Sequence, residues 1–427
     1  MNTALPADPA PSDDQELVAR CVQKASELMY RNLGPYGFLA ATPGTDSRRR
    51  GYDRVFGRDA AICAIAAAHC GDAQLIAGAE RSLLTLAAQQ AANGQIPKYV
   101  DTANNSADFW YLGCIDATLW WLIAIAHLAP HRPRLERRLR LHVARAIDWL
   151  CCQEHQQIFL LQQNEASDWA DIMPRSGFVL YSNALWYYVK GLYRLPHAQE
   201  TATNFNDLFH PSGRHHADYK RLRLLIHYAR HKPTEREMYL SYVNLAHWGD
   251  EGDVFGNLLA TLFGLADEHR SNRIFARIAR NQENAAYPVR VTCVPIGQND
   301  PVWRTYMGRH RQNLEHRYHN GGIWPFVGGF WVMALAAAGR KRQAAKELVA
   351  LARANAEYNW QFNEWFHGQS GKAEGMAGQT WNAAMFLLAR HGLEARVFRH
   401  IYDPAARRLA LAQARTRIEP KPDGTLD

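Results

Sequence analysis

The chain has 427 residues, of which 47% are hydrophobic and 21% charged, so it can bury a large core and has the composition of an ordinary globular protein. The formal net charge is +8, and part of the excess of basic residues lies in residues 131–145. No recognisable nucleic-acid motif accompanies this basic run, so we interpret it as a solvated helix face rather than a nucleic-acid interface. The seven scattered cysteines, an odd number without a CxxC pair, favour reduced thiols over a disulfide framework or a zinc site.

The two ends of the chain differ from its middle. Residues 1–14 are polar and rich in proline, and they lack the basic and apolar regions of a signal peptide, so we expect a disordered leader. Residues 15–405 are expected to form a single domain, and residues 406–427 a polar tail. The longest apolar stretches are shorter than ~18 residues, which predicts no membrane span, and we expect a cytoplasmic protein.

Helical periodicity dominates between these ends, and few stretches alternate in the strand pattern. The pattern predicts helices over residues 15–32, 58–71, 75–92, 112–129, 134–152, 179–194, 217–230, 254–266, 269–281, 327–339, 341–354, 379–391 and 394–401. Short polar breaks join many of them in pairs, as in helical hairpins. The first helix of a pair is often very apolar and the second amphipathic, which indicates an inner ring of buried helices inside an outer ring. We therefore predict an all-α fold, an (α/α)6 barrel of about six hairpins.

The segments that precede the apolar helices are long and rich in Trp, Asp, His and Gly. They are residues 51–59, 93–116, 164–177, 282–325 and 362–381. Structureless connections longer than about 12–15 residues are usually functional or disordered, and the aromatic content of these segments argues against disorder. If the inner helices run in the same direction, all five segments meet at one rim of the barrel and line a cavity.

The residue types in these rim segments suit a carbohydrate. Aromatic rings cover the apolar face of a sugar, carboxylates and amides hold its hydroxyl groups, and two carboxyl groups that flank the scissile bond complete a glycosidase. Taken singly, most of these side chains are equally well explained by packing, so it is their joint pattern that favours a sugar site. The chain has no P-loop, GxGxxG, HExxH or GxSxG motif, and the EHRYH run (315–319) and the DEGD run (250–253) lack further ligands, so we expect no metal and no cofactor.

Five motifs then make the chain recognisable. They are YDRVFGRD (52–59), DVFGNLLATLFGLAD (253–267), PVRVTCVPIGQNDPVWR (288–304), YHNGGIWP (318–325) and NEWFHGQSGKAEGMAGQTWNAAMFLLA (363–389). With these motifs the chain resembles the neutral/alkaline invertase family of glycoside hydrolases (family 100), which have an (α/α)6 barrel. More distantly it is similar to the amylo-α-1,6-glucosidase domain of glycogen debranching enzymes. The resemblance spans roughly residues 50 to 390.

The resemblance implies an inverting hydrolysis with an Asp general acid and a Glu general base. Glu364 matches the base. The family's acid segment reads Ile-Asp-Arg-Arg-Met-Gly, whereas this chain has DWADIMPRSG (168–177), which is closer to the Trp-Met-Asp of the debranching enzymes. Asp171, which keeps Trp169 two residues before it, is the better match to the acid, and Asp168 is its rival.

Further residues are expected to bind the sugar. Arg58, Asp59 and Asp116 would hold it in the first subsite, and His319 and Gln379 would contact its hydroxyl groups. The remaining candidates for substrate binding are Tyr52, Trp169, Asp168, Arg175, Asn320, Trp324 and Trp381.

The expected substrate is sucrose, and the alternative is an α-1,6-glucosidase or other α-glucosidase that acts on short or branched gluco-oligosaccharides. An alternative of a different class is a carbohydrate-binding toroid without catalysis, although such a protein has no need to keep both Asp171 and Glu364. The expected partner is a small carbohydrate, with neither nucleic acid nor membrane, and the sequence leaves a homo-oligomer open.

Overall fold

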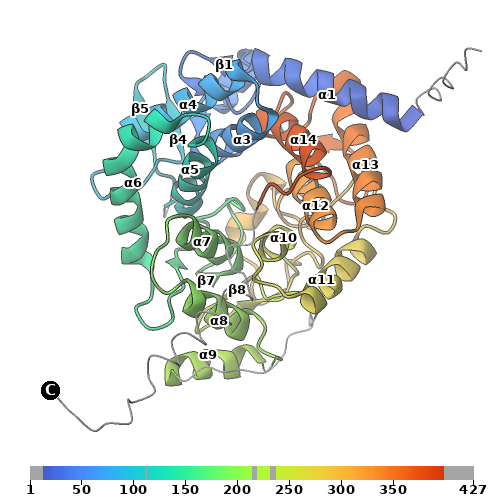
Figure 1. Cartoon of the computed structure of the whole chain (residues 1–427). Helices are drawn as coiled ribbons and strands as arrows, with labels where there is room; N and C mark the ends of the chain where they lie inside the picture. The colour runs from blue at the N-terminus through green and yellow to red at the C-terminus, as the bar shows by residue number, and fades with distance from the viewer. Residues whose placement is uncertain (1–12, 112, 214–218, 231–236, 399–427) are drawn as a thin grey trace, which may run out of the picture.

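The computed structural model describes residues 13–111, 113–213, 219–230 and 237–398, and its helices form a closed ring (Figure 1). Among these residues, the inner ring consists of six helices: α3 (Gly57–Cys70), α5 (Ile115–Leu128), α7 (Leu180–Leu192), α10 (Val254–Leu262), α12 (Pro325–Ala337) and α14 (Thr380–Gly392). Each inner helix contacts the next one along the chain, and α14 contacts α3, which closes the ring.

An outer ring surrounds these helices. It contains α1 (Asp13–Arg31), α4 (Ala73–Ala88), α6 (Pro133–Gln153), α8 (Ala198–Phe209), α11 (Glu268–Asn281) and α13 (Lys341–Trp360), and α9 (Lys220–Arg230) packs on α8. The outer helices from α4 onwards each contact the inner helix that precedes them, whereas α1 packs on α13 and α14. The first helix of the chain therefore completes the last hairpin, and the predicted all-α (α/α)6 barrel is confirmed.

The apolar helices are those of the inner ring and the amphipathic helices those of the outer ring, as predicted. Every residue of α12 from Pro325 to Leu335 is buried, because this helix has neighbours on all sides. In contrast, α6 buries one stripe, which consists of Leu135, Leu139, Ala146 and Leu150. A helix that is apolar all round requires burial on all sides, whereas one apolar stripe suffices for a helix that covers the outside.

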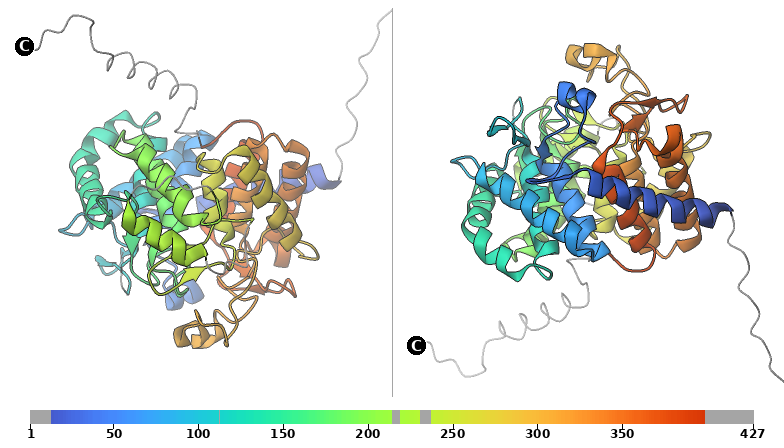
Figure 2. Two further views of the ribbon diagram at one scale, coloured as in Figure 1. Left: turned by 90° about the horizontal axis from the view of Figure 1, so that it is seen from below. Right: turned by 90° about the horizontal axis from the view of Figure 1, so that it is seen from above.

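Short antiparallel strands and single helical turns occupy much of the rim. The strands are β1 (Leu33–Gly34), β2 (Gly37–Phe38), β3 (Val55–Phe56), β4 (Tyr99–Asp101), β5 (Ser106–Asp108), β6 (Gln162–Gln163), β7 (Gly177–Val179), β8 (Tyr242–Val243), β9 (Trp248–Gly249), β10 (Trp365–Phe366) and β11 (Ala373–Glu374). Helix α2 (Thr45–Arg50) and the 3-10 segment η1 (Thr305–Arg311) stand at the same end of the ring (Figure 2). Strand pairing therefore holds the rim segments, and it also joins segments that are far apart in the sequence, since β3 pairs with β4 and β7 with β8.

Some of the predicted helices and their boundaries were wrong. The sequence pattern missed α2 and α8, and residues 394–398 form turns where a helix over 394–401 was predicted. Residues 399–401, most of the predicted leader and the predicted tail lie outside the described residues, while Asp13 and Asp14 are the first two residues of α1. In the part of the chain that the structure describes, no helix is long and apolar enough to cross a membrane.

Candidate active site

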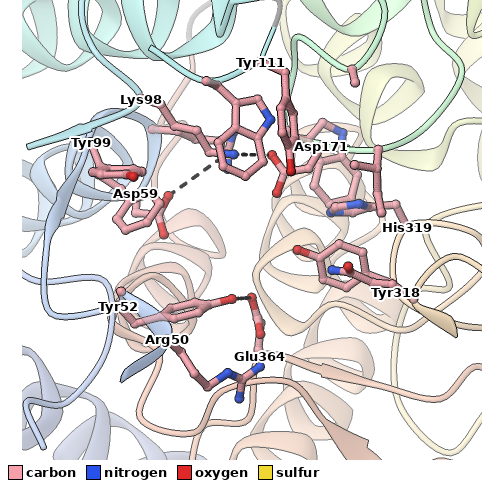
Figure 3. Close-up of a pocket in the computed structure, with 18 of the residues that line it drawn as sticks. Arg50, Tyr52, Asp59, Lys98, Tyr99, Tyr111, Asp171, Tyr318, His319 and Glu364 are labelled. Atoms are coloured by element: carbon pink, nitrogen blue, oxygen red, sulfur yellow. Dashed lines mark hydrogen bonds and ion pairs between the residues drawn. The ribbon is translucent and has the colours of Figure 1, made fainter. Parts of the chain in front are cut away.

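A cavity of about 580 Å³ opens at the rim of the barrel (Figure 3). Its walls come from the segments that precede α3, α5, α7, α12 and α14. All five predicted rim segments therefore contribute to one cavity. Of the predicted site residues, those that line it are Tyr52, Arg58, Asp59, Trp169, Asp171, His319, Trp324, Glu364 and Trp381.

Glu364 is a buried carboxyl group on one side of this cavity, with 4% of its surface exposed. The hydroxyl of Tyr52 donates to its Oε1 at 2.7 Å, and the backbone N–H of Met376 donates to its Oε2 at 2.9 Å. Burial raises the pKa of Glu364 to about 7, and these two hydrogen bonds oppose the rise. A carboxyl group whose pKa is close to neutral is suited to acid–base chemistry.

Asp171 faces the same cavity from the opposite side (Figure 3). The ammonium group of Lys98 lies 2.6 Å from its Oδ1. The side chain of Lys98 is only 4% exposed and that of Asp171 is 18% exposed, so the ion pair is largely withdrawn from solvent. The Lys98 ammonium also lies over the ring of Trp110, 3.0 Å from its centroid.

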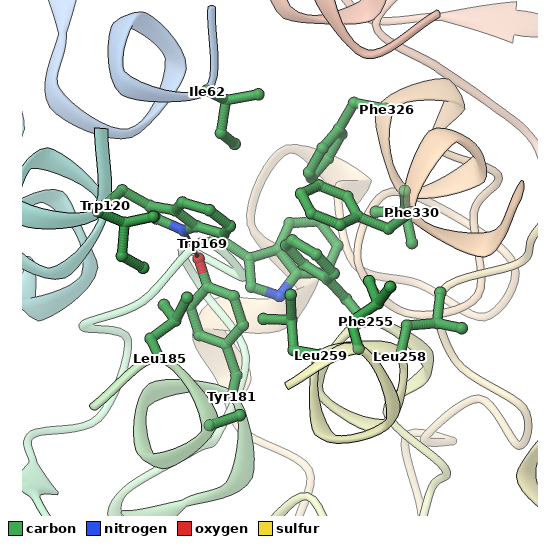
Figure 4. Close-up of a cluster of buried hydrophobic side chains, with 14 of the residues drawn as sticks. Ile62, Trp120, Trp169, Tyr181, Leu185, Phe255, Leu258, Leu259, Phe326 and Phe330 are labelled. Atoms are coloured by element: carbon green, nitrogen blue, oxygen red, sulfur yellow. Dashed lines mark hydrogen bonds between the residues drawn. The ribbon is translucent and has the colours of Figure 1, made fainter. Parts of the chain in front are cut away.

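Trp169, two residues before Asp171, anchors the turn that carries this carboxyl group in the core of the barrel. This indole is 1% exposed and packs edge-on against Trp324, Phe255 and Phe326, with ring centroids 5.4–5.7 Å apart. Figure 4 shows Trp169 reaching into the aromatic core between α5, α10 and α12. Since Trp169 lines the cavity and is also part of the core, it forms a rigid floor for the site.

Arg58 and Asp59 occupy the first turn of α3 at the cavity wall. The Arg58 guanidinium lies 2.9 Å from Oδ2 of Asp116 and 3.8 Å from Oδ2 of Asp59. Burial raises the pKa of Asp59 to about 6, although the charge of Arg58 lowers it. The Tyr181 hydroxyl also donates to Asp116, at 2.9 Å. Asp116 is fully buried and does not line the cavity, so it anchors Arg58 and is not placed to touch a sugar.

His319 presents a neutral ring to the cavity. It stacks on Trp324, with the ring centroids 4.9 Å apart and the planes 8° from parallel. Burial, and then the neighbouring cations, lower the pKa of His319 well below its usual value. Its Nδ1 is buried and has no hydrogen-bond partner among the described residues.

Five predicted binding residues do not line the cavity, and for them the expectation of direct sugar contact is corrected. They are Asp116, Asp168, Arg175, Asn320 and Gln379. Asp168 accepts hydrogen bonds from Nε2 of Gln163 at 3.0 Å and from the backbone N–H of Ala170 at 2.8 Å, so it shapes the turn before Asp171. Its rival role as the acid therefore has no geometric support.

The other three corrected residues are structural. Arg175 is buried 3.3 Å from Asp253 and 3.7 Å from Glu251. The side chain of Asn320 pairs with both backbone groups of Ile296, at 2.7 and 2.8 Å. Gln379 is the buried residue that precedes α14, and its backbone forms an isolated bridge with residue 41.

The structure adds residues that the sequence patterns missed. Lys98 and Tyr318 line the cavity beside the two carboxyl groups, and Arg50 lies near Glu364 (Figure 3). Tyr318 lies within the YHNGGIWP motif, so the motif pointed to its segment, but nothing in the sequence singled out Lys98. The segment η1 also reaches the cavity, because the Tyr306 hydroxyl donates to Oε1 of Glu165 at 2.5 Å.

The described residues offer no group of three or more His, Cys, Asp or Glu side chains that could hold a metal ion. Two of the carboxyl groups that line the cavity, those of Asp171 and Glu364, lie on opposite sides of it, with hydrogen-bonding groups and aromatic rings around them.

Comparison with sequence families gives a match to the family described as alkaline and neutral invertase over residues 253–395. Alkaline/neutral invertase C, mitochondrial, from Arabidopsis thaliana is 27% identical over 168 residues, which are 38% of this chain and 24% of that protein. Neutral/alkaline invertase 1, mitochondrial, from Oryza sativa subsp. japonica is 27% identical over 140 residues, 32% of this chain and 22% of that protein. The matches thus span about a quarter of the length of these relatives.

Among solved structures, the chain is similar to a family 63 mannosylglycerate hydrolase from Thermus thermophilus in complex with Tris and D-glycerate. The TM-score is 0.62 at 14% identity, over 86% of this chain and 99% of the other. A glycosidase variant in complex with glucose has a TM-score of 0.59 at 15% identity, over 90% of this chain and 99% of the other. At these identities the likeness shows the fold.

The family match contains Glu364 but does not reach Asp171, since it begins at residue 253. The resemblance to the alkaline and neutral invertases is therefore confirmed for residues 253–395, in a chain that shares the barrel fold of family 63 glycosidases.

Proposed function

We propose that the protein is an inverting glycoside hydrolase in which Asp171 is the general acid and Glu364 the general base. The observation that carries the proposal is that these two carboxyl groups come from separate rim segments and face one cavity from opposite sides (Figure 3). The similarity to invertases and to glycosidase structures adds independent support. A carbohydrate-binding toroid without catalysis has no use for this pairing.

In the proposed reaction the two carboxyl groups act on opposite faces of the sugar ring. Asp171 protonates the oxygen of the leaving group, and Glu364 takes a proton from the water that attacks the anomeric carbon. Tyr52 and the Met376 N–H hold the two oxygens of Glu364 in place. Preorganised hydrogen bonds of this kind fix the direction in which a base can act.

The sugar in the first subsite would lie between polar and aromatic walls. Arg58, Asp59 and His319 would face its hydroxyl groups, and Trp324 and Trp381 contribute aromatic rings to the walls. Such a combination discriminates between sugars, because a buried polar group left unpaired by the wrong sugar costs more than a lost apolar contact.

Sucrose is the leading substrate, on the strength of the similarity to invertases and of a cavity whose volume, about 580 Å³, suits a small ligand. The second candidate is an α-1,6-glucosidase activity, which the DWADIMPRSG segment favours. We further propose a cytoplasmic location, with which the seven free thiols agree.

The test is a comparison of kcat/KM on sucrose, isomaltose, maltose, mannosylglycerate and a branched dextrin, with chromatography of the products. We expect hydrolysis of sucrose to glucose and fructose to exceed the others. A tenfold preference for isomaltose or the dextrin would replace the invertase assignment by the glucosidase one, and no hydrolysis of any glycoside would refute both.

A further inference from the structure

Glu165 contributes a carboxyl group to the cavity wall, and the proposed reaction gives it no part. It lies on the segment that carries Asp171 and lines the cavity with it. Its side chain is 26% exposed, so the carboxyl group is partly withdrawn from solvent and still open to a ligand. Ala166, the next residue, has a φ of +58°, a value that a residue with a Cβ atom keeps only where the surrounding structure holds it. Glu165 therefore stands on a constrained piece of chain inside the cavity wall.

One oxygen of the Glu165 carboxyl group is held by side chains from another rim segment. The Tyr306 hydroxyl donates to Oε1 at 2.5 Å, and Nε of Arg304 lies 3.6 Å from the same oxygen. Among the described residues, no group donates a hydrogen bond to the other oxygen, Oε2. The carboxyl group is thus fixed through Oε1, and Oε2 is left for a further donor.

The segment of residues 304–313, which contains η1, is bonded to the acid-bearing turn at two points. The first is the bond from Tyr306 to Glu165. At the second, Nδ2 of Asn313 donates to the carbonyl oxygen of Ile172, the residue directly after the proposed acid, at 3.2 Å. The two bonds hold both ends of this turn, so the carboxyl group of Glu165 keeps a fixed place relative to the acid.

The direction of the proposed reaction places the leaving group beside this wall. A general acid gives its proton to the oxygen of the leaving group, so that group lies against the side of the cavity that carries Asp171. Residues assigned to the first subsite come from other elements, since Arg58 and Asp59 belong to α3 and Trp381 to α14. Glu165 shares the segment of the acid and is bonded to η1, which supplies none of the first-subsite residues. The leaving group is therefore the part of the substrate that Glu165 can reach.

We propose that Glu165 determines the specificity for the leaving group, and that its Oε2 accepts a hydrogen bond from a hydroxyl group there. Tyr306 is a positioning residue, because its bond to Oε1 directs Oε2 towards the cavity. The substrate class is a glycoside whose leaving group carries hydroxyl groups, as a second sugar does. The inference rests on the proposed function, since it takes Asp171 as the acid that the leaving group touches.

The first test compares two substrates that share a glucosyl group. One is sucrose, maltose or isomaltose, whichever is cleaved best, and the other is α-glucosyl fluoride, whose leaving group has no hydroxyl group. In Glu165→Leu we expect kcat/KM on the disaccharide to fall about 10- to 100-fold, because a substrate hydroxyl loses its acceptor in a partly enclosed site. The kcat/KM on the fluoride should stay unchanged. An equal loss on both substrates, or no loss on either, overturns the inference.

Three further variants accompany Glu165→Leu. Tyr306→Phe should show the same selective loss to a smaller extent, and Glu165→Gln, which keeps an acceptor oxygen, should retain most of the activity on the disaccharide. The matched control is Glu80→Leu on α4, since the side chain of Glu80 is 28% exposed and lies 3.1 Å from Nε of Arg132. It should leave kcat/KM unchanged on both substrates.

The second test measures binding and does not depend on turnover. In protein that also carries Glu364→Gln, calorimetry should show that Glu165→Leu weakens binding of the disaccharide about 10- to 100-fold and leaves the affinity for α-glucosyl fluoride unchanged. Equal weakening of both ligands, an unchanged affinity for the disaccharide, or no binding of any of the three disaccharides overturns the inference.

Failure of the proposed function gives a different result. Because fluoride leaves without a proton, Asp171→Asn should lose activity on the disaccharide and keep it on α-glucosyl fluoride. Loss of both activities, or retention of both, refutes Asp171 as the acid, whereas the inference is decided by the ratio of the two activities in Glu165→Leu.

Discussion

Gly375 lies so close to Glu364 that a Cβ atom on it would be 2.4 Å from Oε2 of Glu364 and 2.7 Å from its Cβ. The glycine directly follows β11, the strand that pairs with β10 beside Glu364, and its φ of +80° is one that other residues adopt only with strain. The hairpin therefore places Glu364 only because residue 375 has no side chain.

This relationship predicts that Gly375→Ala displaces the Glu364 carboxylate. A misplacement of about 1 Å at a catalytic group costs on the order of 10²-fold in rate, so kcat should fall by about that factor. The measurement is kcat together with the unfolding temperature.

Gly339→Ala is a matched control for that variant. Gly339 has a φ of +77°, but nothing lies within 4 Å of a Cβ built there. It should lose about 1–2 kcal/mol of unfolding free energy from the left-handed backbone and keep its activity. If Gly375→Ala retains the wild-type kcat and loses only stability, as Gly339→Ala does, then the position of Glu364 is not what Gly375 provides.

The acidic limb of the pH–activity profile should follow the ionisation of Glu364. A general base acts in its ionised form, so activity is present above its pKa and is lost as the pH falls through about 7. The hydrogen bond from Tyr52 stabilises the charged form, so Tyr52→Phe should raise the pKa further and move the acidic limb of kcat/KM to higher pH. A limb that stays in place, or moves to lower pH, contradicts the assignment of this limb to Glu364.

The stereochemical outcome should be inversion. An inverting pair leaves room for a water molecule, with the carboxyl groups about 6.5–9.5 Å apart, whereas a retaining pair is about 5–5.5 Å apart. Proton NMR of freshly released glucose should show the β-anomer if an α-glucosidic bond is cleaved. Early accumulation of α-glucose would rule out inversion at a glucosyl centre.

Much of the fold could be predicted from the sequence because burial leaves a strong periodic signal. The all-apolar α12 and the striped α6 differ in a way that identifies inner and outer helices without knowledge of contacts. Helix α8 was missed because it has a mixed polar sequence, and its buried face, which includes Phe205 and Leu208, is defined only by its packing against α7.

The site could be predicted in part. The segments that carry Asp171 and Glu364 stood out by length and composition, but which carboxyl group of DWAD enters the cavity depends on a turn. In the structure Asp168 accepts the N–H of Ala170 and is buried, while Asp171 reaches the cavity. Lys98 was missed because its partner, Asp171, lies 73 positions away in the sequence, and only the fold brings the two side chains together.

The central claim is that Asp171 and Glu364 together perform the hydrolysis. The most direct test is kcat on the best substrate for Asp171→Asn and Glu364→Gln, with Asp168→Asn as the matched control, after each variant has been shown to be folded by its unfolding temperature. Loss of a general acid or base costs on the order of 10²–10⁴ in rate, so both variants should fall by such a factor. Asp168→Asn should keep far more activity than Asp171→Asn, because asparagine retains the oxygen that accepts the Ala170 N–H. Near-wild-type activity of Asp171→Asn, together with a collapse in Asp168→Asn, would contradict the account.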